Sequence, residues 1–161
     1  MSLYFLTSIV SQEWKDTYIH SYITLSGAWS GGNGVISALV TGPLYPTFIE
    51  NQLGIEEARD IFRTYPSFYL ITPRTSVWGD TVLVETPTQN YTANDYQAHF
   101  TDAGYPQGFT QLSQIPLDWP APNVDTYCFY GVSVPTPKMF EYSNGLGAFP
   151  TDIVYGVEMV R

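Results

Sequence analysis

The chain has few of the residues that usually hold metal ions or nucleic acids. One cysteine and two isolated histidines do not make the ligand spacing of a zinc site. Six lysines and arginines oppose 15 acidic residues, so the formal net charge is -9 and no basic cluster exists. Nucleic-acid binding depends on clustered positive charge. We therefore expect no metal site and no nucleic-acid partner.

Long apolar runs and a leader segment are also lacking. No stretch reaches the roughly 20 apolar residues that a membrane-spanning helix needs. Met1 leads directly into "SLYFLTSIV", without the charged and then apolar segments of a signal peptide. Hydrophobic residues make up 44% of the 161, which suffices for one globular domain with a core. The 13 tyrosines suit half-buried walls and lipid-facing grooves.

Helical and strand patterns alternate along the chain, which predicts the α/β class. Apolar spacing in "SLYFLTSIV" predicts the end of a buried helix. Further helices are predicted at "GVISALV", at residues 54–65 and at "TANDYQAHFTDAG". Pro66 ends the second of these and Gly104 ends the third. Thr92 or Asn94 is the expected cap of the third helix.

Strands are predicted where β-branched and aromatic residues gather, at residues 17–25, 81–87, 123–137 and 151–156. The stretch "PSFYLITPRTSVWGD" is interrupted by proline and glycine, which predicts a loop with short extended pieces. Residues 42–122 as a whole carry many prolines, glycines and aromatics. This composition favours a cap or lid inserted into a sheet domain.

The turn "TLSGAWSGGNG", from Thr24 to Gly34, resembles the place where a hydrolase presents a nucleophile. The nucleophile elbow follows G-x-S-x-G between a strand and a helix. Around Ser30, Gly32 matches this pattern, but Ala28 replaces the first glycine. The glycines also lack the lysine of a phosphate-binding loop, so we expect no nucleotide and no other cofactor.

Two histidines are available as a base for such a serine. His20 falls inside the predicted strand 17–25 and is expected to be an ordinary strand residue. His99 follows Ser30 in the chain order of α/β-hydrolases. Its place among polar residues in a helix predicts a solvated side chain instead. The aspartates between Ser30 and His99 that could orient this base are Asp60, Asp80 and Asp95.

Three smaller features each allow a purely structural and a functional interpretation. Glu56, Glu57 and Asp60 cluster at a helix start, where carboxylates usually complement the helix dipole. The triplet "NYT" makes Asn90 an acceptor for N-glycosylation. Cys128 is either a buried small apolar residue or half of a disulfide whose partner is missing.

Three stretches together carry a family resemblance: "LYFLTSIVSQEWKDTYIHSYITLSGAWSGG", "VLVETPTQNYTANDYQAHFTDAGY" and "CFYGVSVPTP". The first is similar to a helix that follows a nucleophile, a "WKD-YI" strand entry and a glycine-tryptophan turn. The others are similar to a "TP…NYT…DY…F" segment and a "C-x-Y-G-x-x-V-P-T-P" strand end. These features resemble lecithin:cholesterol acyltransferase and lysosomal phospholipase A. The resemblance covers nearly the whole chain and is weakest between Val35 and Arg63.

The resemblance implies an α/β-hydrolase fold with a cap and a membrane-contacting element. Residues 1–161 would form a single incomplete domain of this fold, with 42–122 as the inserted cap. The implied reaction is acyl transfer from a phospholipid to water or a lipid alcohol by a Ser-Asp-His triad. The implied partners are these lipids and a membrane or lipoprotein surface. The implied location is secreted or lysosomal.

The catalytic residues that the resemblance implies have no counterparts in this sequence. The family's "G-H-S-x-G" precedes the helix in which this chain begins. Its "G-D-G-D-G-T-V" aspartate follows the strand matched by "IVYG", where this chain continues as "VEMVR" with Glu158 as the nearby carboxylate. The family's histidine lies further on. We therefore assign no catalytic residue, and the chain is expected to be a fragment or abbreviated product.

The resemblance also assigns roles to three residues. Cys128 matches a cysteine whose disulfide partner would fall beyond Arg161. Asn90 matches the family's "NYT", so a glycan is expected there if the chain enters the secretory pathway. Trp29 is expected to wall the acyl pocket, and Ser30 becomes a turn residue.

Three functions remain open from the sequence. The first is a fragment of a phospholipid acyltransferase or phospholipase without triad chemistry of its own. The second is a non-catalytic lipid-binding protein, and the third is an unrelated hydrolase that uses Ser30 with His99. The isolated chain is expected to be poorly stable or aggregation-prone, because its sheet would have unpaired edges. The aromatic residues that motivate lipid binding are Phe62, Tyr65, Phe68, Tyr69 and Trp78.

Overall fold

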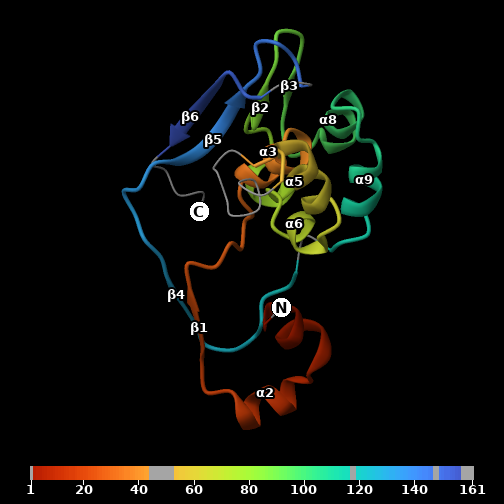
Figure 1. The fold of residues 1–161 in the computed structure, drawn as a ribbon. Coiled ribbons are helices and arrows are strands. Elements are labelled where there is room, and N and C mark those ends of the chain that lie inside the picture. The colour runs from red at the N-terminus through yellow and green to blue at the C-terminus, as the bar shows by residue number, and fades with distance from the viewer. Residues whose placement is uncertain (1, 44–52, 117–118, 147–148, 157–161) are drawn as a thin grey trace.

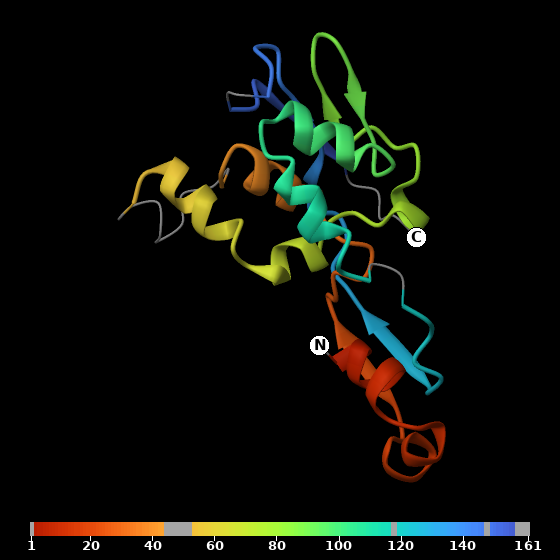
Figure 2. The same cartoon turned by 90° about the vertical axis from the view of Figure 1, so that its right-hand side faces the viewer.

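The molecule has a helical body and a narrower extension. The computed structural model describes residues 2–43, 53–116, 119–146 and 149–156. Figures 1 and 2 show the body at the top, where helices lie beside a sheet, and the extension below it. The extension holds the N-terminal helices and one pair of strands, β1 and β4.

Short helices and strands make up both parts. The extension contains α1 (Ser2–Tyr4), the π-helical turn η1 (Phe5–Ile9), α2 (Gln12–Tyr18), β1 (Tyr22–Leu25) and β4 (Thr126–Phe129). The helices of the body are α3 (Gly34–Val40), α5 (Ile55–Phe62), α6 (Pro66–Leu70), α7 (Thr75–Trp78), α8 (Tyr96–Asp102) and α9 (Gln107–Leu112). Its strands are β2 (Val84–Glu85), β3 (Asn90–Tyr91), β5 (Thr136–Glu141) and β6 (Asp152–Gly156). They form one sheet in the order β3-β2-β5-β6, in which β2 and β5 are parallel and the outer pairs antiparallel.

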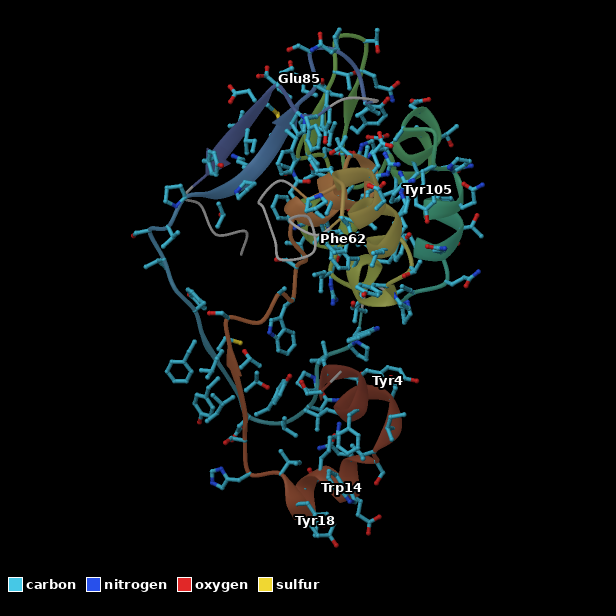
Figure 3. All side chains as sticks on the ribbon, viewed as in Figure 1. Tyr4, Trp14, Tyr18, Phe62, Glu85 and Tyr105 are labelled. Carbon is cyan, nitrogen blue, oxygen red and sulfur yellow. The ribbon has the colours of Figure 1, made fainter. Side chains whose placement is uncertain are left out.

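Aromatic contacts hold the N-terminal helices together. The ring of Trp14 lies 5.6 Å from that of Phe5, edge to face, and 5.2 Å from that of Tyr18. Figure 3 shows Trp14 and Tyr18 on α2, well below the body. The Lys15 Nζ donates a hydrogen bond to the Pro122 carbonyl at 2.7 Å. This bond fixes α2 to the segment that leads into β4.

β1 and β4 form a parallel ribbon with an exposed apolar face. The register pairs Ile23 with Tyr127 and Leu25 with Phe129. Because side chains alternate along a strand, these four lie on one face of the ribbon. Their exposed fractions run from 54% to 76%. We call Ile23, Leu25, Tyr127 and Phe129 the open ribbon face. Parallel sheets are normally covered on both faces, so this exposure is unusual.

One hydrophobic core joins the helices of the body to its sheet. Ile36 and Leu39 of α3, Phe100 of α8 and Phe140 of β5 are fully buried. Complete burial of a side chain of this kind contributes about 1.5–3 kcal/mol. The other core members are Val40, Tyr69, Trp78, Leu83, Val84, Tyr91, Ala93, Tyr96, Leu112, Tyr142 and Leu146.

The predicted helices are largely confirmed. "SLYFLTSIV" forms α1 and η1, and the three further helices are α3, α5 and α8. Gly104 follows the end of α8 with φ 71°, as a terminating glycine should. The prediction that Thr92 or Asn94 caps this helix is wrong. The N-cap residue of α8 is Asp95, whose carboxylate accepts hydrogen bonds from N and Oγ1 of Thr92 at 2.9 and 2.7 Å.

The predicted strands and loops differ more from the structure. Strand 17–25 is reduced to β1 because α2 occupies its first part, and the strand predicted at 81–87 is reduced to β2. The strand predicted at 123–137 is divided into β4 and β5, whereas the one at 151–156 is confirmed as β6. The loop predicted after Pro66 contains α6 and α7. Proline ends one helix and begins the next because its missing N–H costs nothing at a first helical position.

The predicted cap region shares the core of the body. The described residues within 42–122 include the whole of α5, α6, α7, α8 and α9 and the β2–β3 hairpin. Tyr69, Trp78 and Phe100 from this region are buried in the same cluster as Ile36 of α3. The helix α9 was not predicted. That the region covers a substrate stays a prediction.

Asn33 ties the start of α3 to the neighbouring strands β2 and β5. Its side chain is 2% exposed, and Nδ2 donates hydrogen bonds to the carbonyls of Leu83 and Lys138, both at 2.9 Å. Since both partners are acceptors, only the NH₂ end of the amide can face them. The Oδ1 atom is buried and has no hydrogen-bond partner in the described part of the chain.

Replacing Asn33 by aspartate should destabilise the body. Asn33→Asp removes both donors and turns a buried carboxylate toward two carbonyl oxygens. We expect the free energy of unfolding to fall by about 3 kcal/mol, measured by urea unfolding with tryptophan fluorescence. The control Asn123→Asp, at an exposed turn position, should change it by less than about 0.5 kcal/mol. Equal urea midpoints for Asn33→Asp and the parent chain would contradict this role.

Candidate functional site

The turn that follows β1 is braced by the segment that carries α6 and α7. The Ser30 carbonyl accepts hydrogen bonds from the Arg74 backbone N at 3.0 Å and from the Trp78 Nε1 at 2.9 Å. Gly31 has φ 78° and lies against the Thr72 carbonyl, so a side chain at this position would collide with backbone. Ser30 therefore contributes to the turn through its backbone, and the turn fixes where α3 begins.

Trp29 lies beside the ribbon. Its side chain is half-buried, and its ring lies 5.8 Å from the ring of Tyr22 on β1. Trp29 lines neither the polar cavity nor the smaller cavity described below. The role of Trp29 as a wall of an acyl pocket stays a prediction.

His99 is buried, so the prediction of a solvated side chain is wrong. It is 2% exposed, and its ring stacks on that of Tyr91 at 4.8 Å between centroids. Its Nε2 atom has no hydrogen-bond partner in the described part of the chain. Burial lowers the pKa of His99 to about 4, although the carboxylates of Asp102 and Asp95 oppose this shift. The imidazole is therefore neutral at physiological pH.

The other members of the suggested Ser30–His99 triad are occupied elsewhere. The Asp60 carboxylate pairs with Arg59 at 3.2 Å, and the Asp80 carboxylate accepts a hydrogen bond from Asn94 at 2.9 Å. No hydrogen bond joins a serine to a histidine within the described residues. His20 is exposed and lies before β1, not inside a strand as predicted.

Acidic residues do not gather into a metal site in the described ranges. Glu56 and Glu57 lie in the first turn of α5, as the helix-dipole interpretation requires. The described histidines, cysteine and carboxylates form no group of three that could hold a metal ion.

Among the helices that the structure describes, none is long and apolar enough to cross a membrane.

The two residues with predicted covalent modifications are both accessible. Asn90 is exposed on β3, opposite Glu85 of β2. Cys128 is exposed on β4, which corrects the interpretation as a buried apolar residue. It is the single cysteine of the sequence, so any disulfide would need a partner outside these 161 residues.

A polar cavity at the far end of the body was not indicated by the sequence. Its volume is about 560 Å³, and it lies between the β2–β3 loop, the end of α8 and the loop after β5. Tyr91 donates a hydrogen bond to the Asp102 Oδ2 at 2.8 Å at this cavity. A smaller cavity of about 120 Å³ lies between α3 and α5. Sequence patterns could not locate either cavity, because the lining residues come from separate segments.

Helices and parallel strand pairs place the chain in the α/β class. Residues 1–120 match the sequence model of the family described as "Lecithin:cholesterol acyltransferase". The chain belongs to this family, which confirms the resemblance.

Two kinds of relative are similar to the chain. It is 33% identical to the phosphatidylcholine-sterol acyltransferase of Papio anubis over 158 residues, 95% of this chain and 35% of that protein. The human phosphatidylcholine-sterol acyltransferase is 33% identical over 147 residues, 89% of this chain and 32% of its own length. The lysosomal phospholipase A and acyltransferase of Mus musculus is 33% identical over 146 residues, 88% of this chain and 34% of that protein. The chain thus spans about a third of these relatives.

The buried His99 should make the body less stable in mild acid. Its folded pKa of about 4 lies below the ordinary value of 6.5, so the unfolded chain binds the extra proton between these values. The contribution of the neutral His99 to the free energy of unfolding is therefore fully present above pH 6.5. It falls as the pH drops toward 4, by roughly 3 kcal/mol in all. Urea midpoints measured at several pH values should show this loss.

Two substitutions isolate this contribution of His99. His99→Phe keeps an aromatic ring in the apolar site and should flatten the pH dependence between 6.5 and 4. His20→Gln, at an exposed histidine, should leave the dependence unchanged. An unaltered pH profile for His99→Phe would show that another group causes the loss.

Proposed function

We propose that the chain is part of a phospholipid O-acyltransferase or phospholipase A, which moves an acyl group from a phospholipid to a lipid alcohol or water. Family membership supports this substrate class. The relatives carry names that specify phosphatidylcholine and sterol, or phospholipid, as what they act on. A phospholipid and a lipid alcohol are accordingly the proposed partners.

The open ribbon face is the observation that carries the proposal. Two parallel strands with exposed Ile23, Leu25, Tyr127 and Phe129 lack the covering layer that parallel sheets require. Such a face fits the interior of a larger α/β-hydrolase domain. It also supports the expectation that the isolated chain aggregates, because the exposed strands offer unpaired edges.

The turn after β1 would lie beside the reacting groups in that larger domain. In α/β-hydrolases the nucleophile stands at the end of a parallel strand. Trp29 follows the end of β1 and is half-buried against Tyr22. A tryptophan in this place offers a large apolar surface to an acyl chain. We assign Trp29 to the acyl-pocket wall, as a residue that positions substrate.

On this proposal residues 1–161 perform no acyl chemistry by themselves. Covalent acyl transfer needs an activated serine, a base and an acid that orients the base. Ser30 is used through its carbonyl, and the neutral His99 is stacked in the core against Tyr91. Residual binding does not restore the covalent route once the nucleophile and base are missing.

Acyl release from phosphatidylcholine vesicles tests the proposal. The 161-residue chain should give the background rate, whereas the longer protein encoded by the extended reading frame should release acyl chains. In that longer protein Trp29→Ala should lower kcat/KM roughly tenfold, because one wall of an apolar pocket is lost. Ser30→Ala should leave the rate nearly unchanged and serves as the control.

Two outcomes would overturn the proposal. One is release by the 161-residue chain that disappears in Ser30→Ala. The other is a reading frame without G-H-S-x-G upstream and without G-D-G-D-G downstream.

Lipid binding without catalysis is the second candidate, and the open ribbon face favours it. The aromatic residues of the middle region support it less, because Phe62, Tyr69 and Trp78 are buried and Tyr65 is 43% exposed. Co-sedimentation of the 161-residue chain with phosphatidylcholine vesicles is the measurement. Failure to sediment with vesicles would remove this candidate.

A secreted or lysosomal location belongs to the same proposal, with a glycan on Asn90 and a disulfide partner for Cys128 outside this chain. Both side chains are exposed. Expressed in a secretory host, Asn90→Gln should migrate faster on a gel by one N-glycan. Digestion with a glycan-removing amidase should abolish the difference. Asn94→Gln, which lies outside the sequon, should migrate like the parent, and a parent unaffected by the amidase would contradict the assignment.

A further inference from the structure

The polar cavity of the body is assembled from three segments that are distant in sequence. They are the loop 86–89 between β2 and β3, the end of α8 at Asp102, and residues 143–146 after β5. Figure 1 shows the hairpin and the loop after β5 at the same end of the body. Glu85, labelled in Figure 3, marks the point where β2 leads into the hairpin loop. The volume of about 560 Å³ falls within the range of small-molecule sites.

Hydrogen bonds within the walls hold the cavity in shape. The Thr86 hydroxyl donates to the Gln89 carbonyl at 2.8 Å and accepts from the Gln89 N at 3.0 Å, which closes the hairpin loop. The Thr151 hydroxyl donates to the Ser143 Oγ at 3.0 Å. The Tyr91 hydroxyl donates to the Asp102 Oδ2 at 2.8 Å. The site is therefore preorganised on each of its three sides.

Other polar groups of the lining are left available to a ligand. Within the described residues, the Asp102 Oδ1 and the side-chain amides of Gln89 and Asn144 take part in no hydrogen bond. One carboxylate oxygen supplies acceptor sites, and each amide supplies both a donor and an acceptor. Pro87, an exposed residue of the lining, adds an apolar contact surface. This mixture matches a ligand with several hydroxyl groups and a small apolar face.

The charges at the cavity select against ionic headgroups. Its lining contains no lysine, arginine or histidine, and Asp102 is its one charged residue. That carboxylate lies in the last residue of α8, near the negative end of the helix dipole, so a phosphate would be repelled. A quaternary ammonium would need an open aromatic face. Tyr91 is 3% exposed and stacks on His99, so it offers none.

We propose that this cavity binds a neutral pyranose sugar, a function that goes beyond acyl transfer. A pair of ring hydroxyls donates to the Asp102 carboxylate, and neighbouring hydroxyls bond the amides of Asn144 and Gln89. The apolar face of the sugar lies against Pro87. The glycan proposed for Asn90 is not this ligand, because alternation along β3 turns Asn90 to the side opposite Tyr91.

Saturation-transfer NMR with methyl pyranosides tests the site in the full 161-residue chain, made without glycosylation. The probes are the methyl glycosides of glucose, galactose, mannose and N-acetylglucosamine. We expect at least one to bind with millimolar affinity. Asp102→Asn keeps an acceptor for Tyr91 but loses the charge, and should weaken binding roughly tenfold. Asn144→Ala should do the same, whereas Asp125→Asn, an exposed carboxylate elsewhere, should not.

Further measurements distinguish a soluble glycan from a glycolipid as the source of the sugar, and a sugar from choline or phosphocholine as the ligand. Binding to free glycosides alone indicates a soluble glycan, and added binding to phosphatidylcholine vesicles that contain glucosylceramide indicates a glycolipid. Either result supports the site. It is overturned if no glycoside binds, if both cavity variants bind like the parent, or if choline and phosphocholine bind in place of the sugars. None of these results depends on acyl-transfer activity, so they leave the proposed function untouched.

Discussion

The amide of Asn33 is the interaction on which the arrangement of the body depends. It gives both of its hydrogens to carbonyls, that of Leu83 just before β2 and that of Lys138 in β5, and it does so from the end of the glycine-rich turn. One buried side chain therefore fixes the turn, the start of α3 and the junction of two strands that are far apart in sequence. The helix α3 then places Ile36 and Leu39 in the centre of the core.

The ribbon obeys a different constraint. Parallel strands are stable when both faces are covered, yet β1 and β4 expose apolar side chains. In the body, helices pack against the sheet and bury its apolar side chains. In the ribbon, the apolar side chains of one face stay exposed. This contrast between a completed core and an uncovered strand pair supports the proposal that the chain is part of a larger α/β domain, and the family relationship over residues 1–120 agrees with that proposal.

Local signals explain why much of the fold could be predicted. Apolar spacing identified the helical segment of α1 and η1, and Pro66 and Gly104 marked the ends of the helices that became α5 and α8. Gly104 ends α8 because glycine tolerates a positive φ. The failures have physical causes that lie outside each segment. α6 and α7 are short helices that pack under the turn, where Trp78 bonds the Ser30 carbonyl. Asp95 is the N-cap residue of α8 in place of the expected Thr92 or Asn94, and its carboxylate bonds N and Oγ1 of Thr92 in the turn before the helix.

The sequence by itself determined the class of the fold and the family, because these reside in ordered motifs and residue counts. Tertiary structure alone decided the state of individual side chains. His99 reads as a polar helix residue but is neutral and buried, since Tyr91 and Phe100 lie against its ring. Ser30 is expected to be a turn residue, and the structure adds that its carbonyl accepts hydrogen bonds from Trp78 and Arg74. Burial and hydrogen bonding arise between segments that a linear pattern cannot bring together.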